Sequence, residues 1–264
     1  MLTIKEEMKI KTATLFFLCT MLLASCSQKK TGQHVVADID SAKTWLGQDV
    51  DSEQINDIIN TYHINDSTGS KVGSMIFSLA KNGNMLIAKD TSQFDDGRVY
   101  ETAILKVDLE EMTLRGLDMD IKVPNADVFI DLVPSKKKIV GKLRVNRDST
   151  VMVDRKIDST YTYEAFREEI YMLLHTIQLG PGDRIPFKMF FPNDLSVVNS
   201  SLSFEKEEII EVPAGKFKTT VVYLDTGGLL DNRIWISKEN NKKLVKFSVP
   251  KAKLNIELVS SKSL

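Results

Sequence analysis

Short segments in which apolar and polar residues alternate make up most of this chain, as in β-strands with one buried face. The first two, KVGSMIFSLA and MLIAKDT, flank Asn82-Gly83, a pair that tolerates the positive φ of a tight hairpin turn. The others are RVYETAILKVDL, ADVFIDLV, KIVGKLRV, TVMVDRKI, IPFKMFF, KEEIIEVPAG, FKTTVVYL, NRIWIS, KLVKFSV and KLNIELV. Turn residues separate them at intervals of about 8–12 residues. The pattern predicts a mainly β domain over residues 41–264, built as an antiparallel curved sheet or half-open barrel.

Two stretches have the periodicity of a helix. The first predicts a short helix at the start of the domain, with Asp51 and Gln54 as a capping box and a stripe of Ile55, Ile58, Ile59 and Tyr62. The second predicts an interior amphipathic helix over residues 161–178, with an apolar face of Phe166, Ile170, Leu173, Leu174 and Ile177. Gly180-Pro181-Gly182 ends this second helix. We expect it to cover an open face of the sheet.

The N-terminus has the layout of an export signal. An apolar run over residues 12–23 follows Lys9 and Lys11 and is too short for the roughly 20 apolar residues that span a bilayer. LASC, which ends at Cys26, resembles the lipobox at which bacterial lipoproteins are cut before a cysteine that becomes diacylated. We therefore expect a signal peptide over residues 1–25, lipidation of Cys26 and a flexible tether over residues 26–40.

These features predict where the protein is located. Its expected place is the cell envelope, anchored in the outer membrane by lipid and facing the periplasm, since the tether SQKKTGQ lacks the acidic cluster associated with surface export. Cys19 leaves with the signal and Cys26 carries the lipid, so neither remains for a disulfide or a catalytic thiol. The net charge of −1 and the absence of a basic stripe argue against nucleic acid as a partner.

One motif raises the question of catalysis. VVYLDTGG places Asp225 in the Asp-Thr-Gly triplet of aspartic proteases, whose two carboxylates share a proton. The sequence after Asp225 contains only strand-like segments and no Gly-rich flap. Asp-Thr-Gly-Gly between two predicted strands fits a hairpin corner, in which Asp accepts local backbone hydrogen bonds and Gly takes positive φ. We therefore interpret Asp225 as a turn residue.

The other chemical groups also have structural interpretations. His34, His63 and His175 lack metal-ligand spacing, and a partial positive charge on His175 would suit the end of the predicted helix. The pairs Glu168-Glu169 and Glu207-Glu208 fit solvated faces, because adjacent side chains point in different directions. Lys136 to Lys138 fit a guarded hairpin tip, with contact to anionic headgroups as the alternative. We expect no metal, no cofactor and no catalytic residue, and hence not an enzyme.

Much of the chain resembles a known family of exported bacterial proteins, the domain of unknown function numbered three-one-zero-eight. The resemblance lies in EVPAGKFKTTVVYL, RIWIS and LVKFSV, with weaker similarity in YMLLHTIQLGPGDRIPF, VGSMIFSL and VDLEEMTLRG, and spans about residues 71–258. Pro213-Ala214-Gly215 within it fits a tight corner, since Pro fixes φ and Gly permits the reversal. The resemblance implies a half-open barrel with a helix in its mouth, similar to the envelope carriers that shuttle lipoproteins, and no known catalytic residues.

The leading functional hypothesis is a concave sheet that binds an apolar or lipid ligand, or a peptide segment. On the strand after the corner, the inward set would be Phe217, Thr219, Val221 and Tyr223, or its complement. The candidate binding residues are Phe166, Ile170, Leu173, Leu174, Phe187, Met189, Phe191, Phe217, Val221 and Trp235. The alternatives are that these side chains fill a core, that the protein is a scaffold holding another envelope protein by an exposed edge strand, and, with least support, that it is a hydrolase.

Overall fold

The computed structural model describes residues 43–135, 138–148, 150–228 and 230–264, which form a compact unit, Lys43–Leu264. The predicted signal peptide, Cys26 and the whole predicted tether lie outside the described residues. Within the described ranges, no helix has the length and apolar character needed to cross a membrane.

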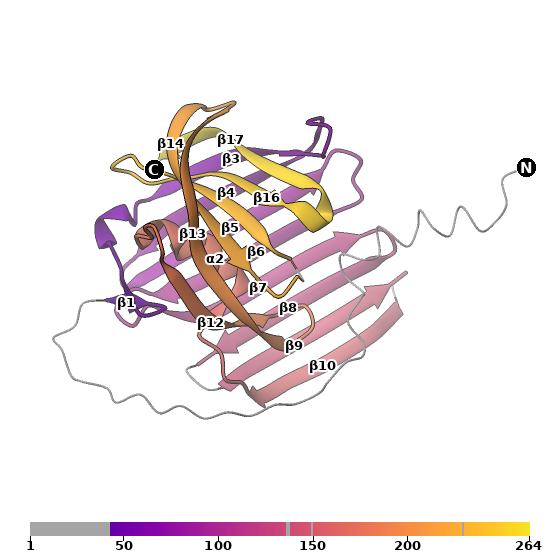
Figure 1. The fold of residues 1–264 in the computed structure, drawn as a ribbon. Coiled ribbons are helices and arrows are strands. Elements are labelled where there is room, and N and C mark those ends of the chain that lie inside the picture. The colour runs from indigo at the N-terminus through magenta and orange to yellow at the C-terminus, as the bar shows by residue number, and fades with distance from the viewer. Residues whose placement is uncertain (1–42, 136–137, 149, 229) are drawn as a thin grey trace, which may run out of the picture. The chain divides into compact units, whose positions relative to one another are not determined.

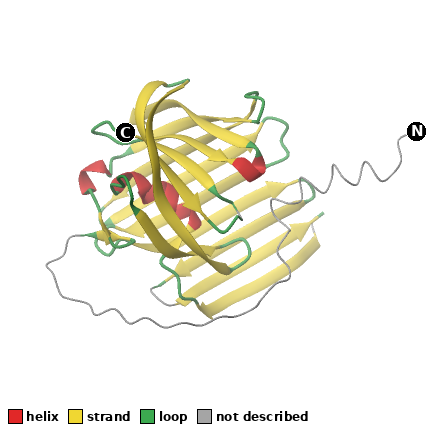
Figure 2. Cartoon of the chain, viewed as in Figure 1, coloured by secondary structure: helices red, strands yellow, loops and turns green. Residues whose placement is uncertain are grey.

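Strands dominate the described unit (Figures 1 and 2). They are β1 (Thr44–Trp45), β2 (Gln48–Asp49), β3 (Ile58–Asn65), β4 (Lys71–Asn82), β5 (Met85–Phe94), β6 (Tyr100–Asp108), β7 (Thr113–Val123), β8 (Ala126–Pro134), β9 (Lys138–Arg147), β10 (Thr150–Thr160), β11 (Ala165–Phe166), β12 (Arg184–Phe191), β13 (Ser196–Val212), β14 (Gly215–Asp225), β15 (Asn232–Ser237), β16 (Leu244–Val249) and β17 (Leu254–Ser263). The helical segments are η1 (Ser52–Gln54), α2 (Arg167–Leu173), η2 (Leu174–Thr176) and η3 (Pro250–Ala252).

Fifteen of these strands form one sheet in the order β10-β9-β8-β7-β6-β5-β4-β3-β17-β16-β15-β14-β13-β12-β11. All neighbours pair antiparallel except β11 and β12, which pair parallel. The two end strands, β10 and β11, do not pair with each other, so the sheet is curved but not closed (Figure 1). The prediction of a mainly β, antiparallel, curved sheet is therefore confirmed.

The two faces of the sheet can be told apart by the position of α2. The Tyr171 ring on α2 lies 5.3 Å from the Phe247 ring on β16, and we call this side the inner face. Residues paired directly across neighbouring strands lie on the same face, so Ile234 on β15 and Val222 on β14 share the inner face with Phe247. On the other side of β16, the pairing through β17 and β3 places Tyr62 on the inner face as well, and its ring lies 5.6 Å from that of Phe247. Most inner-face positions on β4 to β8 are apolar and many are buried, among them Leu79, Leu86, Leu105, Leu117 and Ile130.

The interior helix is present but shorter than predicted. It comprises α2 and η2, residues 167–176. Phe166 precedes it in β11 and Ile177 follows it in extended conformation. The helix begins where the Glu169 carboxylate accepts a hydrogen bond of 3.0 Å from the backbone N–H of Phe166, which satisfies one otherwise unpaired donor at the helix start.

The prediction of a short helix near residue 51 is wrong. Asp51 accepts a hydrogen bond from the backbone N–H of Glu53, as a cap would, but only the single turn η1 forms. The isoleucines at 58 and 59 and Tyr62 lie instead in β3, which pairs with β4 on one side and β17 on the other. Two strand partners therefore outweigh a local helical periodicity, as tertiary context commonly does.

The corner after β13 is a tight two-residue turn. Pro213 and Ala214 connect β13 to β14, and Val212 pairs with Gly215 across the turn. Gly215 has φ +131°, a backbone conformation that L side chains rarely adopt. The backbone N–H of Ala214 donates to the carbonyl of Leu258 on β17 at 3.0 Å, which fixes the hairpin end against that strand.

Candidate functional site on the inner face

The ten residues predicted to bind a ligand are all buried, with exposed fractions between 0 and 9%. Strand pairing places three of them on the inner face. Ile185 of β12 lies opposite Leu202, and Leu202 lies opposite Leu224, which shares the inner face with Val222. Alternate residues of β12 lie on the same face as Ile185, and these are Phe187, Met189 and Phe191. Apolar inner-face side chains are thus present, but they are buried within the domain rather than exposed.

The helix residues fill the core rather than line an open space. Ile170, Leu173 and Leu174 are 0% exposed. Phe166 belongs to an aromatic cluster beside the end of β12, where its ring lies 5.1 Å from Tyr163 and 4.9 Å from Phe190. A ligand could contact Ile170, Leu173 and Leu174 only after the helix had moved.

Phe217, Val221 and Trp235 lie on the outer face. Val221 pairs with Trp235 across β14 and β15, one position out of step with Val222 and Ile234 on the inner face. By register Val222 and Leu224 of β14 lie on the inner face, whereas Phe217, Thr219 and Val221 are buried on the other face and Lys216 and Lys218 are exposed. Strand alternation defines two sets of residues, but it does not say which one faces the interior.

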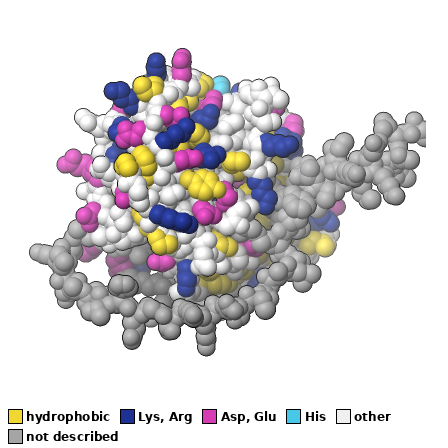
Figure 3. Space-filling view, in the orientation of Figure 1, with side chains coloured by type: hydrophobic (Ala, Val, Ile, Leu, Met, Phe, Trp, Pro, Cys, Tyr) yellow, Lys and Arg dark blue, Asp and Glu magenta, His cyan; other side chains and the backbone are white. Residues whose placement is uncertain are grey.

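Charged residues surround Trp235 on this outer face. Its indole N–H donates to Glu208 Oε1 at 2.6 Å, and Lys246 Nζ lies 5.6 Å from the ring centroid. Lys246 also pairs with Glu257 at 2.7 Å, and Arg233 pairs with Glu205 at 2.8 Å. We call Glu205, Glu208, Arg233, Trp235, Lys246 and Glu257 the outer network. Figure 3 shows acidic and basic side chains interspersed over one face of the molecule, with hydrophobic ones between them.

A second group of charged residues, which the sequence analysis missed, lies on the inner side. Arg167, Glu168 and Tyr171 of α2 approach Asp90 of β5 and Glu101 of β6, and we call these five residues the inner cluster. Arg167 Nη1 lies 3.6 Å from Glu168 Oε1, and the Arg167 guanidinium lies 5.9 Å from the centre of the Tyr171 ring. Ser92 Oγ donates to Asp90 Oδ1 at 3.1 Å.

The environment of this cluster changes the proton affinity of its carboxyl groups. Burial raises the pKa of Asp90 to about 7, and the negative charge of Glu101 adds to the rise. Burial likewise raises the pKa of Glu168 to about 7 despite the neighbouring Arg167. The pKa of Glu101 is raised as well, by burial. The cluster therefore exchanges protons near neutral pH.

The inner cluster also retains accessible surface and unused hydrogen-bonding atoms. Asp90, Glu101 and Tyr171 are partly exposed, and the Arg167 and Glu168 side chains are 19% and 9% exposed. Neither Glu168 carboxylate oxygen, nor Arg167 Nε, has a hydrogen-bond partner among the described residues. Such groups are unusual in a buried setting and fit a site that a polar ligand group completes.

The sequence did contain a signal for this site. On β5, the inward alternation of Leu86 and Ala88 continues to Asp90, and on β6 that of Leu105 and Ala103 continues to Glu101. A carboxylate that takes the place of an apolar residue in the alternation is expected to be buried. The prediction that Glu168 and Glu169 lie on a solvated face is wrong, since α2 is covered on nearly all sides. Burial raises the pKa of Glu169 to about 7, and its side chain is directed to the helix start.

The prediction of a partial positive charge on His175 is also wrong. His175 is 3% exposed, and burial lowers its pKa to about 4, so the imidazole is neutral at physiological pH. His63 lies within β3, and His34 lies outside the described residues. No group of three or more His, Cys, Asp or Glu in the described ranges is arranged to hold a metal ion.

Asp225 is the last residue of β14 and forms a turn, as interpreted. Its Oδ1 accepts from the backbone N–H of Gly227 at 2.9 Å. Asp231 holds the rest of this connection, because its carboxylate accepts from the Thr226 hydroxyl at 2.9 Å and from the Tyr223 hydroxyl at 2.9 Å. Of the three lysines at the predicted hairpin tip, Lys138 pairs with Asp158 at 2.7 Å, and residues 136 and 137 lie outside the described residues.

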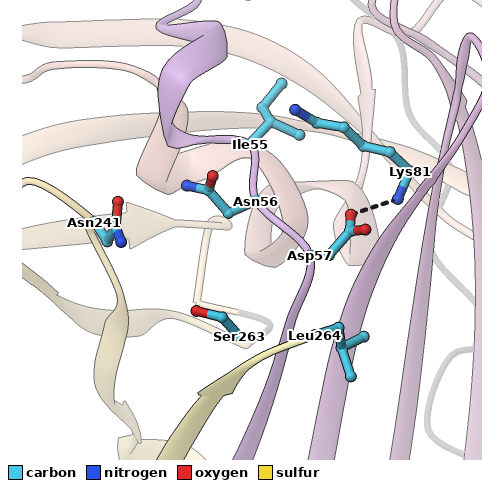
Figure 4. A pocket seen from close by; sticks show the side chains of 7 residues that line it. All are labelled: Ile55, Asn56, Asp57, Lys81, Asn241, Ser263 and Leu264. Carbon is cyan, nitrogen blue, oxygen red and sulfur yellow. Dashed lines mark hydrogen bonds between the residues drawn. The ribbon is translucent and has the colours of Figure 1, made fainter.

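A surface pocket lies where β3, β4 and the end of β17 meet (Figure 4). Its volume is about 320 Å³, and its walls are Ile55, Asn56, Asp57, Lys81, Asn241, Ser263 and Leu264. The Asp57 carboxylate is already engaged, because its Oδ1 accepts from the backbone N–H of Lys81 at 2.7 Å. The inner cluster has more unused hydrogen-bonding capacity and is the stronger candidate site.

Comparison with known proteins adds a family and a fold. Residues 124–256 match the family model described as a protein of unknown function (DUF3108), whereas VGSMIFSL and VDLEEMTLRG precede the match. No curated protein matches the chain. The structure is similar to that of a β-barrel-like protein of domain of unknown function DUF1849 from Brucella abortus, with 12% identity and a TM-score of 0.52, covering 80% of this chain and 98% of that one.

Two further solved structures match with lower scores. One is a protein described as exported, with a YmcC-like fold, from Bacteroides fragilis, at 10% identity and a TM-score of 0.32. The other is a protein described as a lipoprotein from Parabacteroides distasonis, at 11% identity and a TM-score of 0.29. Each match covers 79% of this chain and 96% of the other. TM-scores this low do not support conclusions about this chain. The Brucella structure, at 12% identity, shows a shared fold alone.

Proposed function

The chain belongs to the DUF3108 family of proteins of unknown function, and we propose that it is a non-catalytic, lipid-anchored envelope protein that binds a ligand with a large apolar part on the inner face of its open sheet. The observation that carries this proposal is the combination of an apolar inner face with polar groups that are deep, partly accessible and unpaired. A filled core would be expected to leave no such groups.

The sequence at the N-terminus supports the location in the envelope. An apolar run followed by LASC predicts acylation of Cys26, and one or more acyl chains attach a protein to a membrane without a span. Metabolic labelling with an alkyne fatty acid tests this: the label should appear on the natural chain and disappear in Cys26→Ser. Protease treatment of intact and of permeabilised cells then tests the periplasmic orientation.

The open seam of the sheet gives an apolar ligand a way to enter. Because β10 and β11 do not pair, the sheet can widen there without the loss of ladder hydrogen bonds. Beyond the seam are Phe187, Met189 and Phe191, and then α2, a helix only two turns long that can move as a lid. The binding role of these side chains and of Ile170, Leu173 and Leu174 stays part of the proposal.

Native mass spectrometry of residues 27–264, purified gently from an envelope-containing host, tests ligand binding. The expected result is a bound mass that organic solvent releases and that is identified as a lipid or another amphipathic molecule. Met189→Asp, which places a charge on the inner face, should abolish the bound mass, whereas Ile209→Asp on the exposed part of β13 should leave it. A clean apo mass from every preparation would contradict the proposal.

A second candidate function is a scaffold that holds an envelope protein at the edge of the sheet. It is favoured by β10, an end strand that begins with exposed Val151, Met152 and Val153 at a β-bulge. An unpaired edge with apolar side chains is a template for a partner strand. Cross-linking in cells from a photoreactive residue at Met152 should capture an envelope partner if this function is correct, and not from the same residue at Lys106 on the interior strand β6.

A further inference from the structure

The inner cluster has an excess of acidic groups deep within the domain. The charges of Asp90, Glu101 and Glu168 interact with the single guanidinium of Arg167, which lies 3.6 Å from Glu168 Oε1 and has the Tyr171 ring beside it. Carboxylates outnumber the cation that offsets them by three to one. A buried charge without a partner is costly, so the arrangement favours a further positive charge at this position.

A second observation points to a ligand rather than to proton uptake alone. The Glu168 side chain is only 9% exposed, and both of its carboxylate oxygens lack hydrogen-bond partners among the described residues. Its contact with Arg167, at 3.6 Å, is longer than a hydrogen bond. Two free acceptors on one buried carboxylate require donors, and an ammonium group brings three.

Other kinds of ligand fit less well. A metal ion would need several converging ligands, and the described ranges contain no group of three or more acidic, His or Cys residues placed to hold one. An anionic head group could pair with Arg167, but it would lie beside three carboxyl groups. A protonated amine finds acceptors on Glu168 and Asp90 and leaves the Arg167 ion pair in place.

We propose that the inner cluster binds the protonated amine of an amphipathic ligand, with Glu168 and Asp90 as the acceptors of its N–H groups. This inference rests on the proposed function, because the apolar part of the same ligand lies on the inner face of the sheet. It assigns the ligand class as an amine with an apolar chain. Glu101 and Arg167 set the local charge that selects this class against acids.

Three probes with the same apolar chain and different head groups test the inference. Equilibrium dialysis at pH 8 compares dodecylamine, dodecanol and dodecanoate on the full chain carrying Cys26→Ser, which removes the expected lipidation site. Dodecylamine should bind about tenfold or more tightly than dodecanol, because hydrogen bonds between an ammonium group and carboxylates are stronger than those from a hydroxyl. Dodecanoate should bind most weakly.

Matched variants locate the effect. Glu168→Gln keeps the shape and should lower dodecylamine affinity about tenfold while dodecanol affinity stays the same. Glu110→Gln, at the exposed turn after β6, loses the same charge and should change neither. Asp90→Asn repeats the test should Glu168→Gln fail to fold by circular dichroism.

The outcomes separate this inference from the proposed function. Equal binding of dodecylamine and dodecanol, or amine binding that neither cluster variant weakens, would overturn the amine site and leave the apolar binding site standing. No binding of any of the three probes would overturn both.

Discussion

Glu208 and Glu168 are the same residue type on the two sides of one sheet, and their surroundings act on them in opposite directions. Glu208, in the outer network, accepts hydrogen bonds from Lys206 at 2.8 Å and from Trp235 at 2.6 Å. The hydrogen bond from Lys206, with help from Trp235, lowers the pKa of Glu208. Glu168 has only a long contact to Arg167, and burial raises its pKa to about 7.

This difference shows how to separate structural charges from candidate functional ones. The outer network has two cations for three carboxylates, Lys206 adds a third cation beside Glu208, and its side chains contact water, so its members satisfy one another. The inner cluster has one cation for three carboxyl groups and less contact with water, and it persists on a face whose other buried positions are mostly apolar. An incompletely satisfied set of charges in the interior lowers stability, and a binding function is one reason for a protein to retain it.

The largest effect is expected where the only guanidinium of the inner cluster is removed. Arg167→Met keeps most of the side-chain volume but leaves three carboxyl groups without a cation. Breaking a buried pair in this way costs about 3–5 kcal/mol, so the free energy of unfolding at pH 8 should fall by roughly that amount. Urea denaturation followed by circular dichroism measures it. At pH 5 the loss should shrink, because Asp90 and Glu168, whose pKa values are about 7, are then protonated.

The matched change on the other face is Arg233→Met, which removes the partner of Glu205. Both members of this pair are more than 30% exposed, and exposed pairs contribute about 0–1 kcal/mol. An equal loss of stability in Arg167→Met and Arg233→Met would remove the distinction between the two groups.

The next effect concerns the pH dependence of stability. The folded-state pKa of Glu168 lies near 7, above its unfolded value near 4.5, so the folded protein binds more protons between these values. Its contribution to stability is therefore full below about pH 4.5 and is lost as the pH rises to 7, by on the order of 1–3 kcal/mol. In Glu168→Gln this loss should disappear, which makes the variant more stable than the natural chain at pH 8.

His175 titrates in the opposite sense. Its pKa is lowered from 6.5 to about 4, so its contribution to stability is full above pH 6.5 and is lost as the pH falls toward 4. The difference between the natural chain and Glu168→Gln, measured by urea denaturation at pH 5 and pH 8, cancels the His175 contribution. A difference that does not vary with pH would show that Glu168 is not shifted upward.

The fold was largely predictable because its strands carry local alternation. NRIWIS is β15 residue for residue, and LVKFSV is β16. β3 could not be predicted in this way, because the isoleucines at 55, 58 and 59 and Tyr62 fit a helical stripe, and only the distant partners β4 and β17 decide for a strand. The first half of β13 was missed for a related reason: SVVNSSLS contains few apolar residues, but it pairs with β12.

The candidate site was less predictable than the fold. Its members come from β5, β6 and α2, so no local spacing joins Asp90, Glu101 and Glu168. The apolar binding residues were predicted from the alternation of positions along each strand. For Val221 and Trp235 the positions selected lie on the outer face. The orientation of a strand depends on the curvature of the whole sheet, which a single strand does not encode.

A smaller effect is expected at the start of α2. Glu169→Ala removes the acceptor for the Phe166 N–H and should cost about 1 kcal/mol in the free energy of unfolding. Glu169→Gln keeps an acceptor and removes a buried carboxyl whose pKa is raised to about 7, so it should be neutral or stabilising at pH 8. Thermal unfolding of the two variants at pH 8 separates capping from charge. Equal destabilisation in both would mean that the charge itself holds the helix.

The smallest effect is expected in the outer network, from Lys246→Met. This change removes the 2.7 Å pair with Glu257 and the contact with the Trp235 ring, and keeps much of the aliphatic stem. The expected loss is about 0.5–1 kcal/mol at low ionic strength, and it should decrease as salt rises from about 0.1 to 1 M, because the Debye length falls from roughly 10 to 3 Å. Urea denaturation at both salt concentrations measures it. A loss above about 2 kcal/mol that salt does not change would place Lys246 in an environment like that of Arg167, and the contrast between hydrated and buried charges would then not separate the two faces of the sheet.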